Sequence, residues 1–275
     1  MKNWIIAIIV IVLGLVAWYV LSPQQEAVDE APPPALAEPA PPPPPPPQEP
    51  AEPVVASPEP APEPVIEEPP LPPLADSDPV VIETITGLVG AEQARQYVAQ
   101  EDVVSRLVAT VDSLSGKQVP ASIKVIEGPG GEFQATADDD PSSIILNEAG
   151  DPIPQYVVDP VNYRRYTPYV EMLEGMDNAE LSAAYRDYQP LLEEAFRQLG
   201  YPEGDFEQRL RAVIDELLAT PELSEPARLV KPEAYYLYAD KELESLTAGQ
   251  KALIRMGPDN AARVKAKLVE IRNAL

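Results

Sequence analysis

Three patterns of hydrophobic and polar residues follow one another along the chain. Residues Trp4 to Leu21 form an unbroken apolar run, whereas residues 22–70 contain only a few isolated apolar side chains. From residue 71 onwards apolar side chains recur every three or four positions, which is the period of an amphipathic helix. We therefore expect three parts: residues 1–21, a linker of residues 22–70 and a folded domain of residues 71–275. About 200 residues are ample for one hydrophobic core.

The periodic part begins with two predicted helices. Asp78 is a favourable N-cap and Pro79 suits the first helical position, so we expect a helix from this point to Gly90, where a glycine stops it. The second helix is marked by a single apolar stripe. The stripe consists of Val103, Val104, Leu107, Val108, Val111 and Leu114.

Five more helices are expected in the second half of the chain. One of them contains Pro190, which should interrupt or kink it. The last two meet at Gly257 and Pro258, and Thr247 can cap the first of this pair. Their ranges are 162–176, 177–200, 204–220, 247–257 and 258–275.

The segment between residues 121 and 158 departs from the helical period. Ile123 and Val125 alternate with polar residues, glycines follow at 128–131, and the pattern resumes at Phe133, which indicates a hairpin or an extended excursion. Short strands are also expected at 142–146 and 154–158, and 228–240 reads as extended. The predicted fold class is mainly α, with a small β-hairpin or extended excursion, behind a single transmembrane helix and a disordered Pro-rich linker.

The apolar run at the N-terminus predicts a membrane anchor. About 18 apolar residues are near the lower limit for a helix that spans a bilayer, and Trp4, Trp18 and Tyr19 stand where interfacial aromatics are expected. A cleaved signal peptide is the alternative, but its apolar region would be shorter and closely followed by a small-x-small cleavage site. The positive-inside rule, applied to Lys2, places the N-terminus in the cytoplasm and the remainder outside it.

The linker of residues 22–70 is rich in proline and acidic. Proline prevents helix and sheet from propagating, so an extended polyproline II spacer is expected. Its charges are all negative, since no Lys or Arg occurs between Lys2 and Arg95, and self-repulsion extends such a chain. A PxxP ligand for an aromatic groove is the alternative interpretation of the same composition.

Several long segments of the folded part resemble one uncharacterised bacterial family. They include DPVNYRRYTPYVEMLEGMDNAEL, LLEEAFRQLGYPEGDF, VIDELLATPE and RLVKPEAYYLYADKELESLTAGQKALIRMGPDNAARVKAKL. This order of segments is similar to the domain of unknown function numbered 3014, over most of residues 71–275. The resemblance implies an N-terminal anchor with a Pro-rich spacer, and it implies no activity or cofactor.

The composition excludes several kinds of active site. The chain contains neither histidine nor cysteine, so it has no Ser-His-Asp triad, no Cys-His nucleophile and no His- or Cys-liganded zinc. Asp138, Asp139 and Asp140 could bind a hard cation, but a solvated loop is the simpler interpretation. The net charge of −25 makes general nucleic-acid binding unfavourable, and we expect no cofactor and no nucleic-acid partner.

Two groups of side chains remain as candidates for a binding surface. Tyrosines crowd residues 163–201 and 235–238 and form either core with hydroxyls at the rim or a groove for sugar or peptide. The last two helices carry the most basic part of the chain, including Arg255 and Arg272, which is either a solvated face or a docking surface for an acidic partner. The candidate residues are Tyr163, Arg164, Tyr166, Tyr169, Arg263, Lys265 and Lys267.

These patterns together predict an anchored protein of the bacterial cell envelope. A single-pass helix in the inner membrane, with a cytoplasmic N-terminus, carries an acidic spacer and a helical domain on the periplasmic or extracytoplasmic side. We expect the domain to serve as an interaction or scaffold module with an envelope protein or the cell wall as its partner. The alternative is a protein that binds or cleaves a cell-wall polymer through carboxylates and tyrosines.

Overall fold

The computed structural model describes residues 71–275, apart from 141–143, 147–148 and 234. The predicted transmembrane helix and the predicted linker lie outside these described residues. Within them, no helix has both the length and the hydropathy that a membrane span requires.

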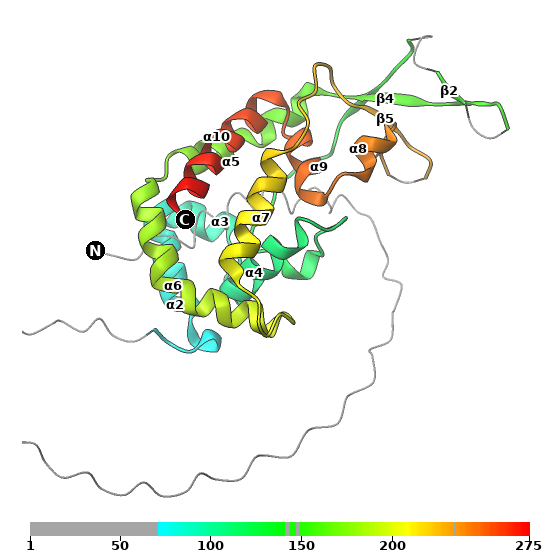
Figure 1. Ribbon diagram of the computed structural model, residues 1–275. Helices are drawn as coiled ribbons and strands as arrows, with labels where there is room; N and C mark the ends of the chain where they lie inside the picture. The colour runs from blue at the N-terminus through cyan, green and yellow to red at the C-terminus, as the bar shows by residue number, and fades with distance from the viewer. Residues whose placement is uncertain (1–70, 141–143, 147–148, 234) are drawn as a thin grey trace, which may run out of the picture. The chain divides into compact units, whose positions relative to one another are not determined.

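The described part of the chain is mainly helical, as the sequence predicts (Figure 1). Its α-helices are α2 (Asp78–Val89), α3 (Ala91–Tyr97), α4 (Val103–Ser113), α5 (Thr167–Glu174), α6 (Asn178–Gln198), α7 (Phe206–Leu218), α8 (Lys241–Ser245), α9 (Ala248–Arg255) and α10 (Pro258–Ala274). Three 3-10 helices accompany them, η2 (Leu74–Asp76), η3 (Ala121–Ile123) and η5 (Pro160–Arg165). Pro190 lies inside α6, and the helix continues through it without interruption.

Two small antiparallel sheets complete the domain. The strands are β1 (Ala135–Ala137), β2 (Ile145–Leu146), β3 (Pro152–Ile153), β4 (Gln155–Val158), β5 (Arg228–Val230) and β6 (Leu237–Tyr238). One sheet has the order β1-β4-β5-β6, and β2 pairs with β3 in the other. Figure 1 shows β4 and β2 in an arm that extends away from the helices. Near its tip Ile144 and Leu146 are 58% and 57% exposed.

The core lies mainly between the helices. Every residue of the predicted 103–114 stripe is buried, and so are the inward residues of α6 and α7. The C-terminal helix α10 packs against α5, α6, α7 and α9 and closes this core. A smaller cluster under the four-stranded sheet contains Val158, Ala227, Leu229 and Tyr238. The two clusters meet beside α9, where the candidate site lies.

The start of the first α-helix differs from the prediction. Ser77 occupies the N-cap of α2, and Asp78 is the first residue of that helix. The Asp78 carboxylate instead accepts hydrogen bonds from the backbone N–H groups of Asp102 and Val103, both at 2.8 Å. Asp78 therefore caps the N-terminus of α4, a partner 25 residues away that local sequence patterns do not indicate.

The extended excursion is present, but its pairing differs from a hairpin across the glycines. Ile123 is the last residue of η3. Val125 and Ile126 are adjacent in the chain and both buried, whereas an alternating strand would bury only one of two adjacent residues. Ile126 forms an isolated bridge with Val98. Strand β1 pairs with β4 across residues 138–154, so the predicted strand at 154–158 is confirmed and the expected hairpin at 123–133 is wrong.

Candidate functional site

A cavity of about 370 Å³ lies between the loop of residues 220–227 and the junction of α9 with α10. Most of its walls are aliphatic, from residues such as Val158, Leu253 and Ile254, and two tyrosines, Tyr163 and Tyr238, complete them. The charged residues that line it are Arg255, Lys265, Glu222, Glu225 and Asp259. Cavities of this size, mostly apolar with a few polar groups, are typical of ligand sites.

The roof of the cavity is the proline-containing loop after α7. Lys265, on α10, donates a hydrogen bond from Nζ to the Thr220 carbonyl at 2.6 Å, and its ammonium lies 3.8 Å from the Glu222 carboxylate. At the other end of the loop, the Val158 N–H donates to the Ala227 carbonyl at 3.4 Å. The loop is thus held at both ends, by α10 and by β4, while Glu222 between them is 89% exposed.

One wall depends on the glycine between α9 and α10. Gly257 has φ +82°, a backbone conformation that side chains rarely adopt, and its Cα faces the Tyr163 ring. A Cβ atom there would lie 2.6 Å from Tyr163 Cδ2 and 2.8 Å from Cδ1. The Asn260 side chain donates to the Tyr163 carbonyl at 2.9 Å and fixes its backbone. The glycine therefore lets the tyrosine ring lie directly against the helix junction.

Arg255 is the most unusual residue in the cavity lining. Its guanidinium lies 5.7 Å from the ring centres of both Phe133 and Tyr238, at cation–π distance. Burial lowers the pKa of Arg255 well below its usual value and raises the pKa of the Tyr163 and Tyr238 hydroxyls. The acidic residues Glu222, Glu225 and Asp259 are exposed, whereas the exposure of Arg255 is intermediate. The positively charged side chain is therefore less exposed than the negatively charged ones.

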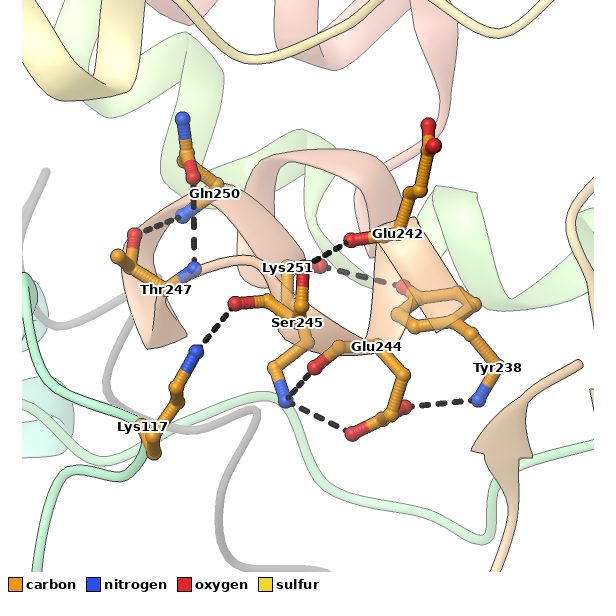
Figure 2. A network of polar contacts seen from close by, with 8 residues as sticks. All are labelled: Lys117, Tyr238, Glu242, Glu244, Ser245, Thr247, Gln250 and Lys251. Atoms are coloured by element: carbon orange, nitrogen blue, oxygen red, sulfur yellow. Dashed lines mark hydrogen bonds and ion pairs between the residues drawn. The ribbon is translucent and has the colours of Figure 1, made fainter. Parts of the chain in front are cut away.

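A network of polar contacts holds Tyr238, which forms part of the cavity wall, in place (Figure 2). The Lys251 side chain is 7% exposed, and its ammonium donates to Glu244 at both Oε1 (2.9 Å) and the carbonyl (3.3 Å). The other Glu244 carboxylate oxygen accepts from the Tyr238 N–H at 2.8 Å, and the Tyr238 hydroxyl donates to the Lys251 carbonyl at 3.4 Å. A capping box between Thr247 and Gln250 starts α9 beside this network, as expected for Thr247.

Replacing Glu244 with glutamine should destabilise the domain by about 1–3 kcal/mol. The change leaves the buried Lys251 charge without its carboxylate, while the size of the side chain is kept. Urea denaturation of the protein measures the difference. The matched control is Glu242→Gln on the same helix, because Glu242 is exposed and should lose less than about 0.5 kcal/mol. Equal losses in the two variants would contradict the assigned role of Glu244.

The structure places the predicted tyrosines and their neighbour in different environments. Tyr163 lines the cavity and Arg164 is exposed. Tyr166 and Tyr169 are each 4% exposed and belong to the helical core. Burial raises the pKa of Tyr166 to about 12, and the Tyr169 hydroxyl donates to the Glu127 carbonyl at 3.2 Å. Of the four, Tyr163 alone contributes to this site.

The predicted basic residues bind α10 to the rest of the domain. Arg263 forms a bidentate pair with Glu174, which lowers the pKa of that carboxyl through the hydrogen bond. Lys267 is buried and donates to the Met176 carbonyl at 2.7 Å, and Lys265 holds the cavity roof. Arg263 and Lys267 therefore attach α10 to the end of α5 and the residues after it, and Lys265 attaches α10 to the loop after α7.

Sequence reasoning did not single out the roof loop or the role of Arg255. Arg255 appeared only as one basic residue among several, and the walls come from segments about 100 residues apart. The two prolines of the roof, Pro221 and Pro226, were the available signal that this loop has a fixed shape.

The acidic run at residues 138–140 serves a structural purpose in the described part of the chain. Arg228 on β5 pairs with Asp138 at 3.0 Å and lies 3.7 Å from Asp140. Among the residues that the structure describes, no three acidic side chains are grouped so as to hold a metal ion. The arrangement supports the simpler interpretation of this run as a loop attached to the sheet.

The comparisons with known proteins identify a family and give no activity. No curated protein and no solved structure matches this chain. A family model does match, over residues 103–272, which include the whole cavity lining. The chain therefore belongs to the family described as protein of unknown function (DUF3014).

Proposed function

We propose that this protein is a single-pass, membrane-anchored interaction module of the bacterial cell envelope, whose extracytoplasmic domain binds its partner in the cavity beneath residues 220–227. The cavity is the observation that carries the proposal. It combines apolar walls with a few polar groups, and hydrogen bonds from Lys265 to the Thr220 carbonyl and from the Tyr238 N–H to Glu244 hold two of its walls.

The sequence before residue 71 supports the position of the domain. The apolar run from Trp4 to Leu21 is long enough to cross a bilayer as a helix, and Lys2 favours a cytoplasmic N-terminus. The proline-rich linker that follows would reach on the order of 150 Å if it were fully extended, at about 3.1 Å per residue. A domain on such a spacer can reach partners well beyond the membrane surface.

Binding accounts for the site better than catalysis. A general acid at neutral pH needs a carboxyl with a raised pKa. The acids that line the cavity are exposed at its mouth. Recognition of a cell-wall polymer remains within the proposal, whereas its hydrolysis has no support from these side chains.

Filling the cavity should abolish partner capture. Ala262 lies in the lining, on the first turns of α10, and Ala262→Trp places a large ring in that space. A photo-crosslinking residue at Ser224, on the roof, reports contacts of the full-length protein in intact cells. We expect adducts that disappear in Ala262→Trp.

The control for this experiment is Ala266→Trp, one helical turn further along α10. Ala266 is exposed and does not line the cavity, so the control adds the same side chain to the same helix. Adducts should persist at wild-type intensity in this variant. An adduct pattern that is the same in both variants would overturn the cavity as the binding site.

The orientation of the chain is tested by a reporter fusion. A reporter that is active only in the cytoplasm, fused after Leu275, should give no signal, because Lys2 is the only charged side chain before the apolar run and no Lys or Arg follows it before Arg95. The same reporter fused before Met1 serves as the positive control. A strong signal from the C-terminal fusion would contradict the extracytoplasmic position.

A further inference from the structure

Acidic side chains border the opening of the cavity on two sides. Glu222 and Glu225 belong to the roof loop, and Asp259 lies on the first turn of α10, on the facing wall. All three are exposed. The Lys265 ammonium lies 3.8 Å from the Glu222 carboxylate and donates to the Thr220 carbonyl at 2.6 Å, so Glu222 remains 89% exposed. Carboxylates in these positions attract positive charge on a ligand that lies across the opening.

The interior of the cavity suits an uncharged apolar group. Leu253, Ile254 and Val158 give aliphatic surface, and Ala261 and Ala262 present only small side chains on the α10 side. A space of about 370 Å³ accommodates one large aliphatic or aromatic side chain. Removing such a side chain from water contributes about 1.5–3 kcal/mol to binding, which makes it an effective anchor.

The charged residues of the lining determine which part of a ligand enters. Arg255 and Lys265 also line the cavity, and both have intermediate exposure, whereas the three acids are exposed. A positive charge on the ligand is therefore attracted to the opening and repelled from the interior, where its burial would also cost solvation. The lining thus favours an apolar side chain with basic neighbours over one with acidic neighbours.

We propose that the cavity binds one apolar side chain of a partner protein, in a segment where basic residues stand on both sides of that side chain. Glu222, Glu225 and Asp259 are the residues that select the basic neighbours. The proposal rests on the cavity being the binding site, as proposed above, and adds the chemistry of the partner. Because the acids lie on facing walls of the opening, the segment carries Lys or Arg both before and after its apolar residue.

The test is calorimetric titration of the full-length protein in phosphatidylcholine nanodiscs, whose neutral lipid does not attract basic peptides, with empty nanodiscs as the blank. The reference probe is acetyl-Ser-Lys-Leu-Lys-Ser-amide. Three further probes replace the central Leu with Ser, both Lys with Glu, or both Lys with Gln. We expect the reference probe to bind about tenfold more tightly than the Ser and Glu probes. Its advantage over the Gln probe should shrink when salt is raised from about 50 mM to about 500 mM.

Variants assign each preference to its part of the cavity. A rim variant with Glu222→Gln, Glu225→Gln and Asp259→Asn should bind the reference probe about tenfold more weakly and the Gln probe as before. Because the whole chain carries a net charge of −25, the control removes three exposed acids outside the lining. It consists of Glu92→Gln, Glu101→Gln and Asp187→Asn, and should bind like the unmodified protein. Ala262→Trp should remove the preference for Leu over Ser, and Ala266→Trp should keep it.

The outcomes separate this inference from the proposed function. No binding of any probe, or equal affinity of the unmodified protein for the Leu and Ser probes or for the Lys and Glu probes, would overturn the partner assignment. Equal losses in the rim variant and its control would do the same. In each of these cases the cavity would still be the binding site if Ala262→Trp abolishes the crosslinks. If the crosslinks are insensitive to Ala262→Trp, the proposed function fails, whatever the peptides do.

Discussion

Replacing Gly257 with alanine should lower the free energy of unfolding by about 3 kcal/mol or more. At φ +82° and ψ 162° a residue with a side chain is strained, at a cost of about 1–3 kcal/mol. The new Cβ also overlaps the Tyr163 ring, and overpacking of this kind typically costs about 1–3 kcal/mol. Urea denaturation of the full-length protein measures the sum.

Two further variants separate strain from overlap. Gly131 has φ +92° and nothing within 4 Å of an added Cβ, so Gly131→Ala should show the strain alone. Combining Gly257→Ala with Tyr163→Ala removes the overlap and should restore part of the loss, which a double-mutant cycle quantifies. Strictly additive effects of the two substitutions would contradict the contact between the glycine and the ring.

Lys267→Glu should be the most damaging charge reversal in the C-terminal helix, with a loss of about 3–5 kcal/mol. Lys267 is 6% exposed, and its ammonium donates to the Met176 carbonyl and pairs with Glu270 at 3.4 Å. A glutamate there buries a negative charge beside a carbonyl and another carboxylate, without any compensating donor from these partners. Thermal unfolding followed by circular dichroism gives the change in stability.

The comparison variant for Lys267 is Arg272→Glu on the same helix. Arg272 pairs with Asp215 at 2.7 Å, but about half of each side chain is exposed, so its reversal should cost about 1 kcal/mol or less. Lys267→Met, which keeps the aliphatic stem and loses the hydrogen bond, should fall between the two. Similar losses for Lys267→Glu and Arg272→Glu would show that Lys267 is not buried in solution.

Elements whose apolar period is regular could be predicted from the sequence. The α4 stripe, the junction of α9 and α10 at Gly257, and the strand at 154–158 depend on local spacing and on glycine or proline signals, and all are present. Asp78 shows the limit of this reasoning. Its residue type indicated a cap, but its partner is the backbone of a helix that begins at Val103, which only the tertiary packing brings close.

The candidate site was predictable only in part, for the same reason. The tyrosines were expected either in the core or in a groove. Tyr163 lines the cavity, whereas its neighbours at the same helical spacing, Tyr166 and Tyr169, are in the core. Residue type does not distinguish these positions, because a tyrosine suits both a wall and a buried face. The basic residues of α10 illustrate the converse, since a charge pattern typical of a solvated face serves here to attach the helix.

The position of α10 after all the helices that it packs against affects when the domain can fold. The helix packs against α5, α6, α7 and α9, so it completes contacts with residues that are synthesised up to about 90 positions earlier. During synthesis, the apolar faces of these helices have no partner until the C-terminal segment arrives. Stop codons a few residues before Leu275 should therefore be tolerated far better than stops before Pro258, whose products would expose the core and become substrates for proteases.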